Sequence, residues 1–97
     1  MDLNLDREAA LLETVLFLET EPLDAITLSR ISGLGKDVVE AALDHLKESL
    51  AGPTHGLELA QVGGGWILAP KRELWMGLKD RYGRKSEQKL SRAAMET

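Results

Sequence analysis

The order of the patterns in the middle of this 97-residue chain constrains its fold more than any other feature. Two short helical patterns, at 24–31 and 36–50, are followed by two strand-like segments with three glycines between them. Alternation over 57–62 and a second short strand over 66–69, joined by a glycine turn, predict an antiparallel hairpin. Helix, turn, helix and hairpin in this order predict an α+β winged helix-turn-helix, a fold that often binds DNA.

Each predicted helix has a start signal and an apolar face. A first helix over 7–20 follows Asp6, whose carboxylate can accept hydrogen bonds from the first turn. Asp24 caps the second helix, and Gly33 suits its left-handed C-terminal turn. Pro70 suits the first position of an additional C-terminal helix. The candidate core residues of the first three helices are Leu11, Leu12, Val15, Leu16, Leu18, Ile26, Leu28, Ile31, Val39, Ala42, Leu43, Leu46 and Leu50, and the fourth helix clusters Leu74, Trp75, Leu78 and Tyr82.

The predicted winged-helix domain occupies residues 1–83, a length that supports one small hydrophobic core. The polar segment 84–89 is typical of a linker. A helical pattern resumes over 90–97 and stops without a C-terminal cap. We therefore expect 90–97 to be the start of a second domain that is truncated here.

The composition argues against several classes of function. Cysteine is absent, and His45 and His55 lack the spacing of metal ligands, so no metal site is expected. No nucleophile, phosphate-binding or dinucleotide-binding motif occurs, so we expect no enzyme activity, no cofactor and no small-molecule substrate. No apolar run reaches about 18 residues and the N-terminus is acidic, so neither a membrane span nor a secretory signal is expected. A cytoplasmic protein fits these observations.

The charge of the third predicted helix argues against its use as a DNA-reading helix. A recognition helix needs Arg, Lys, Asn or Gln on its exposed face to contact bases and phosphates. The exposed face of 36–50 carries two lysines and four acids, and the helix has no Arg, Asn or Gln. The net charge of the chain is −4, with twelve of its sixteen acids within 1–60. Any DNA contact should therefore be weak or indirect, although a DNA-binding transcriptional regulator stays open as the alternative function.

Two apolar residues of the first predicted helix project away from its main apolar face. Ala10 and Phe17 are seven positions apart and point nearly opposite to that face. Met76 likewise points away from the apolar cluster of the fourth helix. Either the wing or the fourth helix covers this second side, or the side contacts another chain. The predicted dimer or partner interface comprises Ala10, Phe17 and Met76.

Four segments, in their order and spacing, carry a resemblance to a known family. They are ETVLFLETEPLDAITLSRISGL, VVEAALDHLKESL, GLELAQVGGGWILAPK and LSRAAMET, and they span nearly the whole chain. The chain resembles segregation and condensation protein B, the bacterial ScpB family. Within these segments the most telling residues are Leu16-Phe17, Glu21-Pro22-Leu23, Gly56-Leu57-Glu58-Leu59, Gly64-Gly65 and Leu90-Ser91-Arg92-Ala93-Ala94.

The resemblance implies a protein of two tandem winged-helix domains, with the first domain and the opening of the second present here. Such proteins dimerise largely through the first domain and bind the kleisin subunit ScpA mostly through the second. With the SMC ATPase, the complex organises and segregates the chromosome. We therefore expect a non-enzymatic, homodimerising scaffold in the cytoplasm at the nucleoid, which reaches SMC through ScpA. A small adaptor outside chromosome biology is a third possibility.

Overall fold

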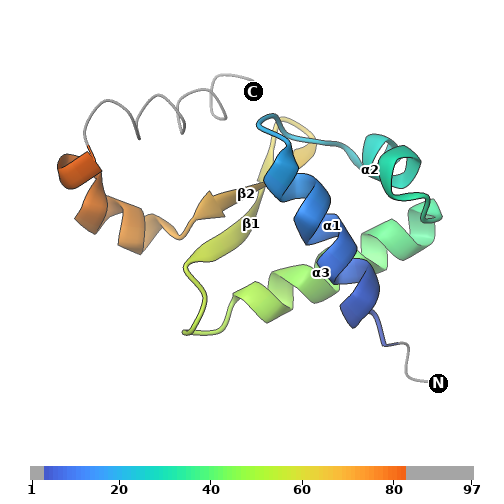
Figure 1. The fold of residues 1–97 in the computed structure, drawn as a ribbon, viewed down its shortest axis with the longest axis horizontal. Coiled ribbons are helices and arrows are strands. Elements are labelled where there is room, and N and C mark those ends of the chain that lie inside the picture. The colour runs from blue at the N-terminus through green and yellow to red at the C-terminus, as the bar shows by residue number, and fades with distance from the viewer. Residues whose placement is uncertain (1–3, 83–97) are drawn as a thin grey trace.

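Three helices form the body of the molecule. The computed structural model describes residues 4–82 and contains α1 (Asp6–Leu18), α2 (Ala25–Ser32) and α3 (Lys36–Leu50) in this region. Figure 1 shows α1 crossing α3, with α2 at the end of the molecule where α3 begins. The helix-turn-helix predicted between the second and third helices is thus confirmed.

A two-stranded wing follows the helices. β1 (Leu57–Val62) pairs with β2 (Gly65–Pro70) in an antiparallel register without interruption. Gly63 and Gly64 form the turn with φ of 56° and 83°, left-handed values that glycine adopts without strain. A further helix over 72–82 projects from the wing on the side away from α2 (Figure 1). This order of elements confirms the predicted α+β winged helix-turn-helix with an additional C-terminal helix.

The hydrophobic core lies where α1, α2 and α3 meet one face of the wing. Leu12, Leu28 and Val39, one from each helix, are fully buried. Burial of each such side chain contributes roughly 1.5–3 kcal/mol to folding, so these contacts hold the helices together. The buried residues of the core are Ala9, Leu12, Val15, Leu16, Leu28, Val39, Ala42, Leu43, Leu46, Leu50 and Leu59.

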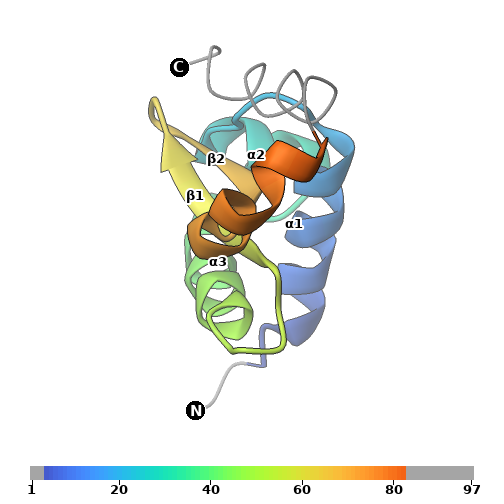
Figure 2. The same cartoon turned by 90° about the vertical axis from the view of Figure 1, so that its left-hand side faces the viewer.

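The connection between α1 and α2 is bound to the wing. Trp66 donates its N–H to the carbonyl of Leu23 at 2.7 Å, and Leu23 donates to the carbonyl of Trp66 at 3.0 Å. Gly65 packs so closely here that a Cβ atom on it would lie 2.8 Å from Cβ of Pro22. β2 is therefore paired with β1 on one edge and with Leu23, at Trp66, on the other, and β1 is the outer strand of the wing (Figure 2).

Four of the predicted core residues are exposed, and those predictions are wrong. On α1, Leu11 and Leu18 face solvent, because the helix buries a narrower stripe than the wide apolar arc of its sequence. On α2, Ile26 and Ile31 are exposed. This helix has only eight residues, and Leu28 alone among them is buried, so a single side chain anchors it.

Three boundary predictions are also wrong. The N-cap of α1 is not Asp6, which is the first helical residue; Asn4 Oδ1 accepts the N–H of Asp6 at 2.9 Å. The helix ends at Leu18, two residues earlier than predicted. Pro70 ends β2 instead of opening the fourth helix. It pairs with Leu57 at a position where the ladder requires no N–H from β2, so proline is tolerated there.

The predicted ends of α2 are confirmed. Asp24 Oδ1 accepts the N–H of Thr27 at 2.7 Å, and Gly33 ends the helix with a left-handed φ of 78°. Two predictions concern the C-terminal end of the chain and are not tested by the structure. The linker 84–89 and the start of a second domain over 90–97 lie outside the described residues.

Candidate interaction surfaces

The helix over 72–82 carries an apolar face that the described residues leave largely uncovered. Leu74, Leu78 and Tyr82 are exposed, Tyr82 to 61%, and Trp75 is half-buried. They recur every three or four positions and therefore share one side of the helix. We call these four residues the C-terminal apolar face. An exposed cluster of large apolar side chains marks a contact surface.

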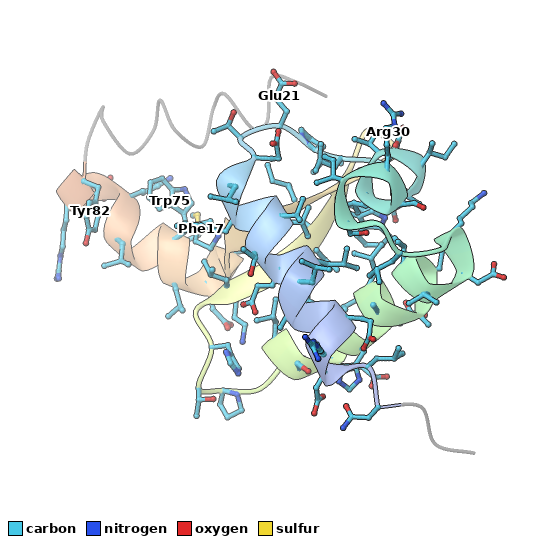
Figure 3. All side chains as sticks on the ribbon, turned by 45° about the vertical axis from the view of Figure 1, so that its right-hand side comes forward. Phe17, Glu21, Arg30, Trp75 and Tyr82 are labelled. Atoms are coloured by element: carbon cyan, nitrogen blue, oxygen red, sulfur yellow. The ribbon has the colours of Figure 1, made fainter. Side chains whose placement is uncertain are left out.

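All three residues predicted to form an interface are exposed. Phe17 is exposed to 74%, Met76 is also exposed, and Ala10 lies on the outer side of α1. Figure 3 shows Phe17 on the side of α1 toward which Trp75 and Tyr82 lie. Within residues 4–82, neither the wing nor the helix over 72–82 buries Phe17, so the described part of the chain does not support the alternative that one of them covers it. Contact of these residues with another chain stays a prediction.

The outer face of α3 is acidic, as the sequence predicts. It presents two lysines and four carboxylates to solvent, and no Arg, Asn or Gln occurs on the helix. Carboxylates at this position repel phosphate and oppose the electrostatic term that dominates non-specific DNA binding. The exposed charged residues are Lys36, Asp37, Glu40, Asp44, Lys47 and Glu48.

The histidines occupy structural or exposed positions. His45 Nε2 lies 2.6 Å from Asp6 Oδ1, and His55 is exposed in the connection after α3. Within residues 4–82 no three His, Asp or Glu side chains converge as metal ligands would. In the same region, none of the helices combines the length and the apolar character that crossing a bilayer requires.

A groove of about 360 Å³ lies between the end of α3, β1 and the start of the last helix. Lys47, Lys71 and Arg72 line it together with two acids, Glu58 and Glu73. Lys71 Nζ donates to a backbone carbonyl at 2.8 Å, and Glu58 Oε2 accepts the backbone N–H of Arg72 at 3.3 Å. We call this the basic groove. In the sequence, Lys71 and Arg72 are only part of a run of charged residues. Their position beside Lys47 could not be predicted, because it arises only when the chain folds.

Comparison with known proteins identifies the family. The model of the family described as segregation and condensation complex subunit ScpB matches residues 10–97. The chain belongs to the ScpB family. Segregation and condensation protein B of Myxococcus xanthus (strain DK1622) is 32% identical over 95 residues, which cover 98% of this chain and 29% of that protein. The chain thus spans less than a third of this ScpB relative.

Three solved structures share the fold. A crystal structure described as a dimer of the ScpB N-terminal domain complexed with a ScpA peptide has a TM-score of 0.70 at 23% identity, covering 78% of this chain and 88% of that one. The crystal structure of ScpB from Mycobacterium tuberculosis has a TM-score of 0.71 at 21% identity, and the match covers 84% of this chain and 51% of that one. A conserved hypothetical protein from Chlorobium tepidum scores 0.68 at 20% identity, covering 91% and 56%. At these identities the likeness is one of fold.

Proposed function

We propose that this chain is a non-enzymatic, homodimerising scaffold in the SMC–kleisin complex that condenses and segregates the bacterial chromosome. Membership of the ScpB family supports the role in that complex. One observation carries the dimerisation: the C-terminal apolar face and Phe17 both lack a covering element among residues 4–82. The related fold described as a ScpB N-terminal domain dimer with a ScpA peptide supports both a second copy and the kleisin as partners.

A second copy is the simplest partner for the exposed apolar side chains. A two-fold interface uses the same patch on both protomers, so a helix with an uncovered apolar stripe can cover its own copy. A stable interface buries about 800 Å² on each partner, more than one helical stripe supplies. Phe17 and Ala10 on α1 would enlarge the patch, and Met76, exposed on the side of 72–82 away from the C-terminal apolar face, would add a separate contact. These residues remain the predicted dimer contacts.

DNA is proposed to be a weak or indirect partner. The acidic outer face of α3 disfavours a reading helix, and the last helix carries two bases instead, the half-buried Lys79 and the exposed Arg81. We infer that the protein reaches the chromosome through ScpA and, through it, SMC. A cytoplasmic, nucleoid-associated location follows from these partners. Binding through protein contacts alone requires no cofactor and no substrate.

Two measurements on the full-length protein test the proposal. The protein is expected to co-elute with ScpA after co-expression, and failure to do so would contradict the kleisin partnership. Anisotropy of a labelled duplex at low salt is expected to show weak binding that Lys79→Ala with Arg81→Ala reduces. Tight binding that is instead lost on Lys36→Ala with Lys47→Ala would favour the DNA-binding regulator.

A further inference from the structure

The outer edge of β1 presents backbone groups that no described residue binds. Trp66 directs its N–H and C=O away from β1, where both bond to Leu23. Facing residues of an antiparallel pair alternate between bonded and non-bonded, so Gln61, which faces Trp66, directs its own groups away from β2. By the same alternation Leu59 and Leu57 direct theirs outward too. Three residues of β1 thus expose hydrogen-bonding groups along one edge.

The two edges of the wing differ in protection. The edge of β2 is bonded to Leu23 at one residue, Trp66, whereas none of the backbone bonds within residues 4–82 reaches the outer edge of β1. Proteins usually block such an edge with proline, lysine or a bulge. β1 has the sequence LELAQV and a continuous register, and so has none of these devices. The edge is open to pairing with another extended segment.

The basic groove adjoins this strand. Glu58 and Leu59 of β1 line it, and it gathers three of the eight Lys and Arg residues but only two of the thirteen Asp and Glu residues in the described part of the chain. The side-chain nitrogens of Lys47 and Arg72 are exposed and bond to no other described residue, and Lys71 uses one of its three donors. A predominantly acidic chain therefore gathers three basic side chains, against two acidic ones, in a groove that includes Glu58 and Leu59 of its edge strand.

We propose that the edge of β1 binds an extended segment of another protein that carries acidic side chains. The backbone of the segment pairs with Leu57, Leu59 and Gln61, as in other complexes formed by strand addition. The carboxylates of the segment contact Lys47 and Arg72, and this charge complementarity makes the edge prefer acidic segments to basic ones.

A second copy of β1 fits the edge less well. It supplies a single acid, Glu58, whose carboxylate already accepts the N–H of Arg72. The proposal goes beyond the dimer and the kleisin partnership, since it uses none of Ala10, Phe17 or Met76. Either can fail without the other.

The probe is an eight-residue peptide of alternating valine and glutamate, titrated into the isotope-labelled chain and followed by its amide NMR signals. The signals of Leu57, Leu59 and Gln61 are expected to shift most. A matched peptide of alternating valine and lysine is expected to bind at least about fivefold more weakly. A glutamate peptide with N-methylated amides facing β1 should not bind, since it cannot donate to the edge.

Two variants separate the backbone and charge contributions. Gln61→Pro removes one outward donor without removing a bond of the hairpin, and is expected to weaken the glutamate peptide about tenfold. Gln61→Ala keeps that donor and should bind like the parent. The double variant Lys47→Gln with Arg72→Gln should lower the affinity for the glutamate peptide about fivefold. The amide spectrum of this variant without peptide should still be that of a folded protein.

Four results would overturn the proposal. The amide signals of β1 could fail to shift at millimolar glutamate peptide, or the lysine peptide could bind as tightly as the glutamate peptide. Gln61→Ala and Gln61→Pro could lower the affinity for the glutamate peptide equally. Finally, Gln61→Pro could dissociate a dimer of the chain. The last would show that a second copy occupies the edge. Loss of dimerisation by Phe17→Asp bears only on the proposed function, so the two ideas fail separately.

Discussion

His45 Nε2 lies 2.6 Å from Asp6 Oδ1, so an imidazole of α3 contacts a carboxylate at the start of α1. The side chains are 35% and 75% exposed, and water therefore screens the contact. It is the one close contact between a basic and an acidic side chain in the part of the chain that the structure describes. The crossing of α1 and α3 thus depends on apolar burial far more than on charge.

The first prediction is that this pair contributes little to stability. Asp6→Asn and His45→Gln are each expected to lower the free energy of unfolding by less than about 1 kcal/mol, with a coupling energy of about 0.5 kcal/mol. A double-mutant cycle by urea unfolding at neutral pH measures both. A coupling energy above about 2 kcal/mol would contradict this prediction and show that the pair contributes substantially to the packing of α1 against α3.

Gly65→Ala is expected to destabilise the protein by about 1–3 kcal/mol. The added Cβ would lie 2.8 Å from Pro22 Cβ and 3.1 Å from the backbone nitrogen of Leu23, so the bond between Leu23 and Trp66 must shift. Gly77→Ala is the matched control, because its Cβ meets no atom within 4 Å and alanine favours the helix. Equal midpoints of thermal unfolding for the two variants would contradict this account.

Leu28→Ala is expected to cost about 2–5 kcal/mol, because it leaves a cavity at the only buried side chain of α2. The control is Ile26→Ala on the same helix, where the side chain is 60% exposed and the change should cost less than about 0.5 kcal/mol. Urea unfolding of both variants gives the comparison. Similar losses at the two positions would mean that the exposed isoleucine is covered in solution.

Acid should weaken the cap of α2. The backbone N–H of Thr27, aided by its hydroxyl and by Arg30, lowers the pKa of Asp24 below its ordinary value of 3.8. The carboxylate therefore stabilises the fold fully above that value, and this stabilisation is lost as pH falls through the lower folded-state pKa. Asp24→Asn keeps a cap that does not titrate. Urea unfolding at several pH values measures the difference in free energy of unfolding between the parent and this variant. The parent's greater stability should shrink as the pH falls, and a difference that does not change with pH would refute the mechanism.

Much of the fold could be predicted from the sequence because its signals are local. The spacing from Val39 to Leu50 identifies α3, and Asp24 and Gly33 mark the ends of α2. The exposure of Leu11 and Leu18 could not be predicted in this way. Which edge of a wide apolar arc is buried depends on where the neighbouring helices and the wing lie, and periodicity contains no such information.

The candidate surfaces were only partly predictable for a similar reason. Phe17 stands opposite the buried side of α1 in any helical projection, so its exposure follows from periodicity once the core side is known. The basic groove joins Lys47 to Arg72 across the wing, and the open edge of β1 depends on Leu23 taking the other edge. These are tertiary relationships between segments that are distant in sequence.

Sedimentation velocity at about 100 μM, well above the dissociation constant of an interface of ordinary size, tests the central claim most directly. The parent chain and Ile26→Asp, a control at an exposed apolar residue of α2, are predicted to sediment as dimers. Phe17→Asp is predicted to sediment as a monomer, because a buried carboxylate without a partner disrupts an apolar contact. A parent chain that is monomeric at this concentration, or a Phe17→Asp variant that stays dimeric, would contradict the account.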